Sequence, residues 1–416
     1  MSTDAAVSLR QANVTLGILM ACSGLATSTW MARFPSVRDT LGISSAAMSW
    51  ILLLVAVGAL GIVVFGGALV VRFGERPLHV AGTHLTTVAF GLIIGGLLIR
   101  SMPLVAFGAG VNAAATSMVG MPINTTAAAI ELRAGHSMLP RFHGIYGFGC
   151  LAGAGIAAMV SRLGVGPVWN YAVVAVVVWV VRLVVVRHSA IPPKAAGPAG
   201  RSPQGTQAGD RPTAVETARG AMRAWLERRT WTIAFLVFLF TVAEAAANNW
   251  MTLGVVDGMA TTEAVGALTY AVFQVAYSLM RFFGGHLTDR FGRPAALAIS
   301  ALVGLAGIVV FSLASSMAEV EIGAVLWGLG VALAFPEGVA AVGGDPLRRP
   351  GRVAVVSSVS ALAGQGAPPL MGWISAYTEL RVVFLWVAGL LGLALVLTGL
   401  IRRDLAGDGA TARLAE

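Results

Sequence analysis

The sequence predicts an all-α integral membrane protein with twelve transmembrane helices, arranged as two pseudo-symmetric six-helix bundles with both termini in the cytoplasm. Composition, apolar runs and an internal repeat support this fold class. Of the 416 residues, 57% are hydrophobic and 11% are charged, whereas soluble domains average about 25% charged residues. The chain has too little polar surface to cover a water-soluble protein of this length. We therefore expect membrane lipid to cover much of the protein surface. The net charge of +9 is spread over short loops, which does not favour a nucleic-acid partner.

Twelve apolar runs are long enough to cross a bilayer, whose core of about 30 Å needs roughly 20 apolar residues in a helix. The first six helices are expected near residues 13–34, 46–71, 78–99, 103–132, 141–162 and 167–187. The second six are expected near residues 230–255, 263–286, 295–315, 319–341, 353–376 and 382–402.

Composition divides the chain into four regions. We predict a first bundle over 1–190, a cytoplasmic linker over 191–229, a second bundle over 230–403 and a cytoplasmic tail over 404–416. The linker is rich in Pro, Gly and Ala, as is typical of chain between domains. Its last part, Pro212–Glu227, has apolar residues at helical spacing. This spacing predicts an amphipathic helix lying on the membrane surface.

The basic residues predict which side of the membrane each loop faces. With the N-terminus inside, the cytoplasmic segments hold most of the basic residues, as the positive-inside rule requires. The outer segments then hold Arg33, Arg38, Arg100, Arg162 and Arg381. Lys194 is the one lysine in a chain biased towards Ala, Gly and Val, which indicates a bacterial gene. We therefore expect a multi-pass protein of a bacterial cytoplasmic (inner) membrane.

Three sequence echoes indicate that the second six helices repeat the first six. Arg72-Phe73-Gly74 follows the second predicted helix, and Arg290-Phe291-Gly292 follows the eighth. Leu-Ala-Gly-x-Gly occurs at 151–155 and again at 362–366. The third echo pairs two prolines with later acids, namely Pro122 with Glu131 and Pro336 with Asp345. Parallel six-helix halves are a known transporter plan that holds substrate at the repeat interface.

The loop after the eighth helix resembles the signature loop of the major facilitator superfamily. The matching residues are Gly285, Leu287, Asp289, Arg290, Gly292 and Arg293. The resemblance implies alternating-access transport and a cytoplasmic charge cluster that holds the outward-facing state, with Asp289 pairing with arginine and Asp345 joining the cluster. In the first copy of the loop, after the second predicted helix, Arg72 and Gly74 match the signature. This copy departs from the signature at two positions, because Val71 stands in place of the acid and Glu75 stands in place of arginine. Glu131 could compensate for these departures.

A finer resemblance concerns a bacterial branch distantly related to fucose-type sugar permeases. It is carried by Trp30–Pro35, by Asn124 with Glu131, by Phe142-His143-Gly144 and by Glu244 with Trp250. This branch does not fix a substrate.

Nothing in the sequence indicates an enzyme, since it has no CxxC pair, no HExxH site and no GxxxxGKS/T loop. We therefore expect no metal and no cofactor, with transport driven by an ion gradient, such as a proton gradient, or by the substrate's own gradient. Ionisable residues inside membrane helices are costly and point to function. Glu244, in the seventh predicted helix, is the first candidate for proton coupling, and Glu337 and His143 follow. The alternative for Glu244 is a structural hydrogen bond or ion pair with a neighbouring helix.

Six polar residues at suitable depth are candidates for substrate contact. They are Asn112, Ser117, Asn248, Tyr270, Gln274 and Gln365. Each one could instead form a hydrogen bond between helices, which is the common role of polar residues in membrane bundles.

Two transport directions stay open. Proton-coupled efflux of an amphipathic small molecule, such as a drug or natural product, is favoured by the apolar helices and by fifteen methionines, which pack adaptably. It implies antiport and antibiotic resistance, although Ala154 stands where drug antiporters have proline. Proton-coupled uptake of a sugar-like nutrient is the alternative, and a non-transporting membrane sensor is a remote one. The expected partners are a small-molecule substrate and lipid, and the expected state is a monomer.

Overall fold

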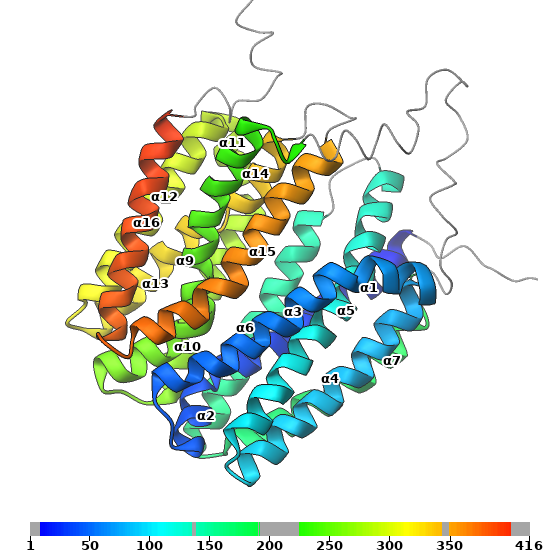
Figure 1. Cartoon of the computed structure of the whole chain (residues 1–416), viewed down its shortest axis with the longest axis vertical. Helices are drawn as coiled ribbons and strands as arrows, with labels where there is room; N and C mark the ends of the chain where they lie inside the picture. Colours follow the sequence, from blue (N-terminus) through cyan, green and yellow to red (C-terminus); the bar gives the residue numbers. More distant parts are fainter. Residues whose placement is uncertain (1–8, 135–138, 190, 192–223, 343–348, 401–416) are drawn as a thin grey trace, which may run out of the picture. The chain divides into compact units, whose positions relative to one another are not determined.

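The structure is a computed structural model that describes residues 9–134, 139–189, 191, 224–342 and 349–400. These residues form helices and no strand. The first half contains α1 (Leu9–Ala32), α2 (Phe34–Leu41), α3 (Ser45–Phe73), α4 (Glu75–Leu98), α5 (Met102–Ala134), α6 (Leu139–Arg162) and α7 (Pro167–Val186). The second half contains α9 (Arg228–Met259), α10 (Glu263–Phe283), α11 (Gly285–Phe291), α12 (Arg293–Leu313), α13 (Met317–Val331), α14 (Ala334–Ala341), α15 (Arg349–Ile374) and α16 (Leu380–Leu400). Figure 1 colours them in chain order.

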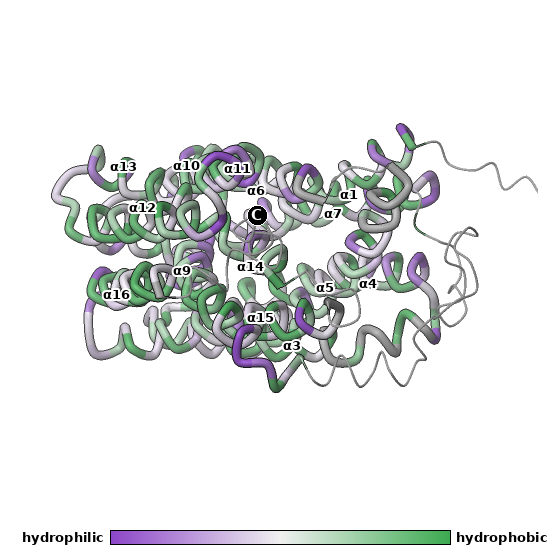
Figure 2. Tube along the Cα trace, turned by 90° about the horizontal axis from the view of Figure 1, so that it is seen from above, coloured by the Kyte–Doolittle hydropathy of each residue, from purple (hydrophilic) through white to green (hydrophobic). Residues whose placement is uncertain are grey.

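Eleven helical segments of the described chain are long and apolar enough to cross a membrane, with α13 and α14 counted together. The twelfth long helix is α10, which is more polar because it carries Glu263, Tyr270, Gln274 and Arg281. Figure 2 shows that hydrophobic residues dominate the helices and that many hydrophilic residues lie at turns. The all-α, twelve-helix membrane fold expected from the sequence is confirmed.

Three predicted runs are divided in the structure. The run predicted over 13–34 ends at Ala32, and α2 follows as a separate short helix with Pro35 in its first turn. The run over 319–341 breaks between α13 and α14, where Pro336 cannot donate to the carbonyl four residues earlier. The run over 263–286 ends at Phe283, and α11 begins two residues later.

Close glycine contacts bring pairs of helices together. In the first half, α1 packs against α6 and α3 against α5. Gly149 of α6 lies against the backbone of Ala21, and Gly58 of α3 lies against Gly110 of α5. A side chain at these glycines would meet backbone atoms of the neighbouring helix, so only glycine allows this spacing.

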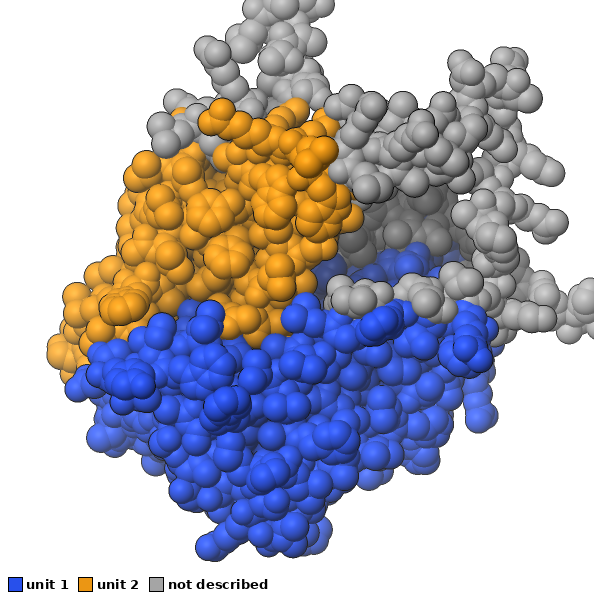
Figure 3. Space-filling model, in the orientation of Figure 1, with its two compact units in different colours: residues 1–200, 248–278, 368–380 blue, residues 201–247, 279–367, 381–416 orange. Residues whose placement is uncertain are grey.

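The described chain forms two compact units, coloured separately in Figure 3. Unit 1 contains residues 1–200, 248–278 and 368–380, and unit 2 contains residues 201–247, 279–367 and 381–416. The ends of α9 and α10 that meet at their connecting turn therefore pack in unit 1 with the first six membrane helices. The predicted boundaries of the two sequence halves remain a prediction, and the predicted linker helix Pro212–Glu227 falls almost wholly outside the described residues.

Candidate functional site

Three of the predicted substrate residues form one hydrogen-bonded cluster in unit 1. Asn248 lies on α9, and Tyr270 and Gln274 lie one helical turn apart on α10. The Asn248 Oδ1 atom accepts hydrogen bonds from the Tyr270 hydroxyl at 3.2 Å and from Gln274 Nε2 at 3.1 Å. Gln274 Nε2 also contacts the Tyr270 hydroxyl at 2.6 Å. Tyr270 and Gln274 are buried, so the cluster places amide and phenol groups inside an apolar helical pair.

The cluster has the chemistry to recognise hydroxyl or amide groups. An asparagine or glutamine side chain presents both a carbonyl acceptor and an amide donor, and a tyrosine hydroxyl both donates and accepts. Since buried polar groups are costly unless they are satisfied, a ligand that enters such a cluster must replace the bonds that it breaks. If it bound a ligand, such an arrangement would discriminate by hydrogen bonding more strongly than an apolar pocket does.

The other three substrate candidates lie on other helices. Asn112 and Ser117 are half-buried on α5 in unit 1, and Gln365 is half-buried on α15 in unit 2. The Asn112 Oδ1 atom is buried without a hydrogen-bond partner among the described residues. Buried acceptors of this kind call for an explanation, and contact with substrate remains the prediction for Asn112.

Glu244 forms an ion pair inside unit 2. Its Oε2 atom lies 3.8 Å from Nη2 of Arg281 on α10, and both side chains are partly buried. Along α9, Glu244 precedes Asn248 by four residues, which is about one helical turn. Sequence reasoning anticipated an ion pair for Glu244 as the alternative to proton coupling, but it did not identify Arg281 as the partner.

Glu337 contacts the signature loop. Its carboxylate accepts hydrogen bonds from Arg293 Nε at 2.8 Å and from the Thr288 hydroxyl at 2.7 Å. The arginine pair that the resemblance implies for Asp289 stays a prediction, and Asp289 and Arg290 are exposed on α11. The carboxylate that binds the signature arginine is thus Glu337, one residue after the proline that separates α13 from α14.

In both copies of the signature loop, the glycine between two helices has a positive φ angle. Gly74 ends α3 and precedes α4 with φ +89°, and Gly292 ends α11 and precedes α12 with φ +78°. Both angles lie in the region that strongly favours glycine. In each copy an arginine guanidinium lies 5.4 Å from the ring of the next phenylalanine, Arg72 over Phe73 and Arg290 over Phe291.

Four other predicted site residues lie elsewhere on the helices or outside the described structure. Gly285 is the first residue of α11, and His143 is half-buried in the first turns of α6. Glu131 lies on α5, but its side chain is outside the described part of the structure, and Asp345 lies outside the described residues altogether.

The Glu337 contact predicts a stability difference between two acids. Glu337→Gln should lower the free energy of unfolding by about 1–2 kcal/mol, between the values for exposed and for buried ion pairs, because the Arg293 pair is partly buried. Asp289→Asn is the matched control at an exposed site, and its change should stay within about 0.5 kcal/mol. Melting temperatures of the purified variants measure both. A larger loss for Asp289→Asn would mean that the signature acid stabilises this loop instead.

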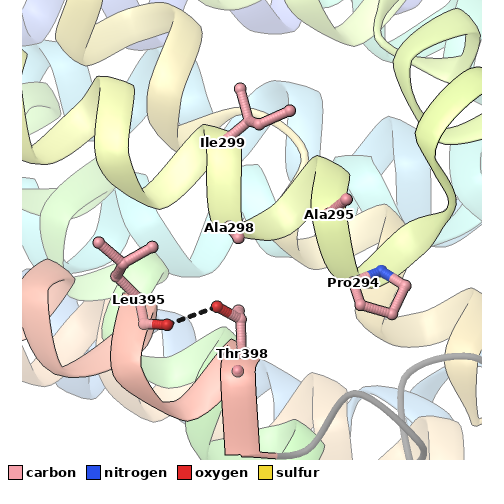
Figure 4. A pocket seen from close by; sticks show the side chains of 7 residues that line it. Pro294, Ala295, Ala298, Ile299, Leu395 and Thr398 are labelled. Atoms are coloured by element: carbon pink, nitrogen blue, oxygen red, sulfur yellow. Dashed lines mark hydrogen bonds between the residues drawn. The ribbon is translucent and has the colours of Figure 1, made fainter.

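A pocket between α12 and α16 is a poor candidate for a polar substrate. Figure 4 shows Pro294, Ala295, Ala298, Ile299, Leu395 and Thr398, and Gly399 also lines it. The Thr398 hydroxyl donates to the Leu395 carbonyl of its own helix at 2.6 Å, so the lining offers mainly apolar surface. Lipid chains suit this surface better than a hydroxylated molecule does.

The fold and its polar residues define a class of protein. Spanning helices in two sequence repeats, with a polar cluster and an ion pair on helices of the second repeat, are the features of a secondary transporter. The Major Facilitator Superfamily model matches residues 16–336 and 233–414. The chain belongs to this superfamily, and it is a multi-pass membrane transporter rather than an enzyme.

Relatives and solved structures agree with this assignment. An uncharacterised MFS-type transporter of Yersinia pestis is 26% identical over 375 residues, which covers 89% of this chain and 90% of the relative. The nucleoside transporter NupG, in a mutant form, has a TM-score of 0.76 at 12% identity and covers 94% of this chain and 99% of its own. The Escherichia coli fucose:proton symporter FucP, also in a mutant form, has a TM-score of 0.62 at 16% identity, covering 93% and 98%.

Proposed function

We propose that this chain is a proton-coupled secondary transporter of a bacterial inner membrane, and that its substrate is a small molecule bearing several hydroxyl or amide groups. The observation that carries the substrate class is the Asn248–Tyr270–Gln274 cluster. A substrate with its own hydrogen-bonding groups can replace the bonds of the cluster that it breaks, whereas an apolar substrate that separated these side chains would leave them unpaired. This supports the sugar-like alternative among the two substrate classes that the sequence left open.

The similar folds are compatible with this substrate class. NupG is a nucleoside transporter and FucP is a fucose:proton symporter, and nucleosides and sugars both present several hydroxyl groups. At these identities the likeness concerns the fold, so the substrate proposal depends on the polar cluster of this chain.

Proton coupling is assigned to Glu244 and its partner Arg281. The Glu244 carboxylate lies 3.8 Å from the Arg281 guanidinium, and a proton gained or lost at this carboxylate would change the charge of the pair. Exchange of a proton at Glu244 would thus make and break an ion pair between α9 and α10. No cofactor takes part in this scheme, and the energy comes from the proton gradient.

Efflux of an amphipathic drug or natural product is the second candidate. The strongly apolar helices and the fifteen methionines favour it. It differs from the first candidate in the substrate class, so a binding experiment can distinguish the two.

A ligand screen with the full-length protein in nanodiscs tests the substrate class. We expect nucleosides, sugars or polyols to raise the melting temperature, and amphipathic dyes and antibiotics to leave it unchanged. Gln274→Leu should weaken the binding of an active compound about 10-fold or more, because it leaves buried groups unpaired. Thr398→Val, in the apolar pocket of unit 2, is the control and should bind normally. Binding of amphipathic compounds that is insensitive to Gln274→Leu would instead favour efflux.

A further inference from the structure

One carboxylate in unit 1 accepts three hydrogen bonds and forms an ion pair with residues from the first half of the chain. Glu263, the first residue of α10, accepts from the backbone N–H of Ser36 at 2.8 Å and from its hydroxyl at 2.6 Å. The Ser161 hydroxyl donates to it at 2.8 Å, and Arg33 Nη1 lies 3.0 Å away. Arg33 also donates to the Val165 carbonyl at 2.7 Å. The pair is deeply buried, with side-chain exposures of 2% for Arg33 and 10% for Glu263.

A second ion pair is formed by two residues that lie close in sequence to those of the first pair. Arg38 Nη1 contacts both carboxylate oxygens of Asp257, at 2.6 and 2.8 Å. Arg38 Nε also pairs with Asp39 at 3.0 Å. This pair is more accessible than the first, with exposures of 15% for Arg38 and 40% for Asp257. It should therefore be weaker and more sensitive to salt than the Arg33–Glu263 pair.

Both pairs join the same two turns, which come from different sequence halves. Arg33 lies directly before α2 and Arg38 lies in the last turn of α2, while Asp257 and Glu263 lie on either side of the turn from α9 to α10. The partners are 227 residues apart for Ser36 and Glu263, and 219 for Arg38 and Asp257. These two segments follow the C-terminal ends of α1 and α9. The distribution of basic residues predicts that this side is the outer one.

The burial of Arg33 and Glu263 is difficult to explain by stability alone. A buried ion pair gains little over a well-packed apolar pair, whereas a single unpaired buried charge is very costly. Such pairs are therefore well suited to a contact that has two states, paired and separated. In unit 1 they connect the first half of the chain to the last part of α9 and to α10, whereas residues 228–247 of α9 and 279–283 of α10 belong to unit 2.

We propose that Arg33–Glu263 and Arg38–Asp257 form a latch that closes the outer side of the transporter, and that this latch must open once in each transport cycle. This inference rests on the proposed transport function, with the alternating access that the family resemblance implies. A substrate can reach the outer side only if the outer ends of the two sequence halves separate. Separation of these turns breaks both ion pairs together. Arg33 and Glu263 are then gating residues, remote from the polar cluster that recognises substrate.

Distances between spin labels at Thr40→Cys and Thr262→Cys test the latch in nanodiscs without any substrate. The native Cys22 and Cys150 are buried and are replaced by alanine. We expect one short distance in the parent protein. In Glu263→Gln, which keeps the size of the side chain but removes its charge, we expect a longer distance, with the ratio of open to closed molecules raised about 10-fold or more. Arg162→Gln is the control, since Arg162 is an exposed arginine at the end of α6, and should not shift the distances.

A charge exchange at the more accessible pair keeps the test valid if Glu263→Gln does not fold. Arg38→Glu alone should favour the longer distance, and Arg38→Glu combined with Asp257→Arg should restore the short one. Unchanged distances in folded Glu263→Gln and Arg38→Glu would overturn the latch. If the distances shift but no polar compound binds, the proposed substrate class fails and the latch stands. If polar compounds bind but neither variant shifts the distance, the latch fails and the substrate class stands.

The side of the membrane can be tested with the same cysteine. A membrane-impermeant maleimide should label Thr262→Cys in intact cells, because the turn is predicted to face outwards. Labelling only after lysis would place the latch on the cytoplasmic side and would refute its role as an outer gate.

Discussion

Gly149→Val is expected to destabilise the protein by about 3 kcal/mol or more, towards and beyond the upper end of the cost of overpacking a core. A Cβ atom at Gly149 of α6 would overlap the carbonyl oxygen of Ala21 on α1. The obstacle is backbone, so no rotation of a side chain can relieve it. Gly24 and Gly153 face the same helix pair and also lie against backbone atoms, so α1 and α6 would have to move apart along much of their length.

Gly155→Val is the matched control on the same helix. No atom lies within 4 Å of a Cβ built at Gly155, so this variant should change the free energy of unfolding by less than about 1 kcal/mol. The melting temperature and the yield of monodisperse protein, measured for both variants in one detergent, give the comparison. Equal melting temperatures would mean that α1 and α6 are farther apart than the structure shows.

Glu244→Gln is expected to abolish proton-driven transport against a gradient. Glutamine cannot release a proton, and it removes the charge that pairs with Arg281. Exchange of substrate across the membrane without a gradient should continue, because this exchange requires no net proton movement. Proteoliposomes with an imposed pH gradient measure accumulation, and counterflow measures exchange. Glu244→Asp keeps the carboxylate and should retain part of the accumulation. If Glu244→Gln accumulates substrate fully, Glu244 has only a structural role through its ion pair with Arg281.

The same variant decides the direction of transport in cells. In an efflux-deficient bacterium, the parent chain would protect against an antibiotic or dye if it were an exporter, and Glu244→Gln would not. Our proposal of a polar substrate predicts no protection from amphipathic compounds by either protein. Protection by the parent protein that Glu244→Gln loses would establish proton-coupled efflux and contradict the proposed substrate class.

Local sequence pattern was enough to predict the membrane spans, although it did not predict that α2, α11 and α14 are separate helices. The run predicted over 167–187 is observed as Pro167–Val186, because the hydropathy of a span and its flanking Gly and Pro are short-range properties. The paired glycines at 74 and 292 have the same left-handed backbone in both copies. Tyr270 and Gln274 share a helix face through the four-residue period alone, so their grouping could also be anticipated.

Only the tertiary structure could supply the partners of the charged and polar residues. Asn248 joins Tyr270 and Gln274 because α9 and α10 pack together, and Glu337 binds Arg293 of the signature loop. The pairs of Arg33 with Glu263 and of Arg38 with Asp257 connect segments more than 200 residues apart. Hydropathy determines which segments enter the membrane, but it carries no information on which helix ends meet. The sequence by itself thus determined the spans and the repeat, while the packing of helices decided which charges pair, because an ion pair depends on distances of a few ångströms.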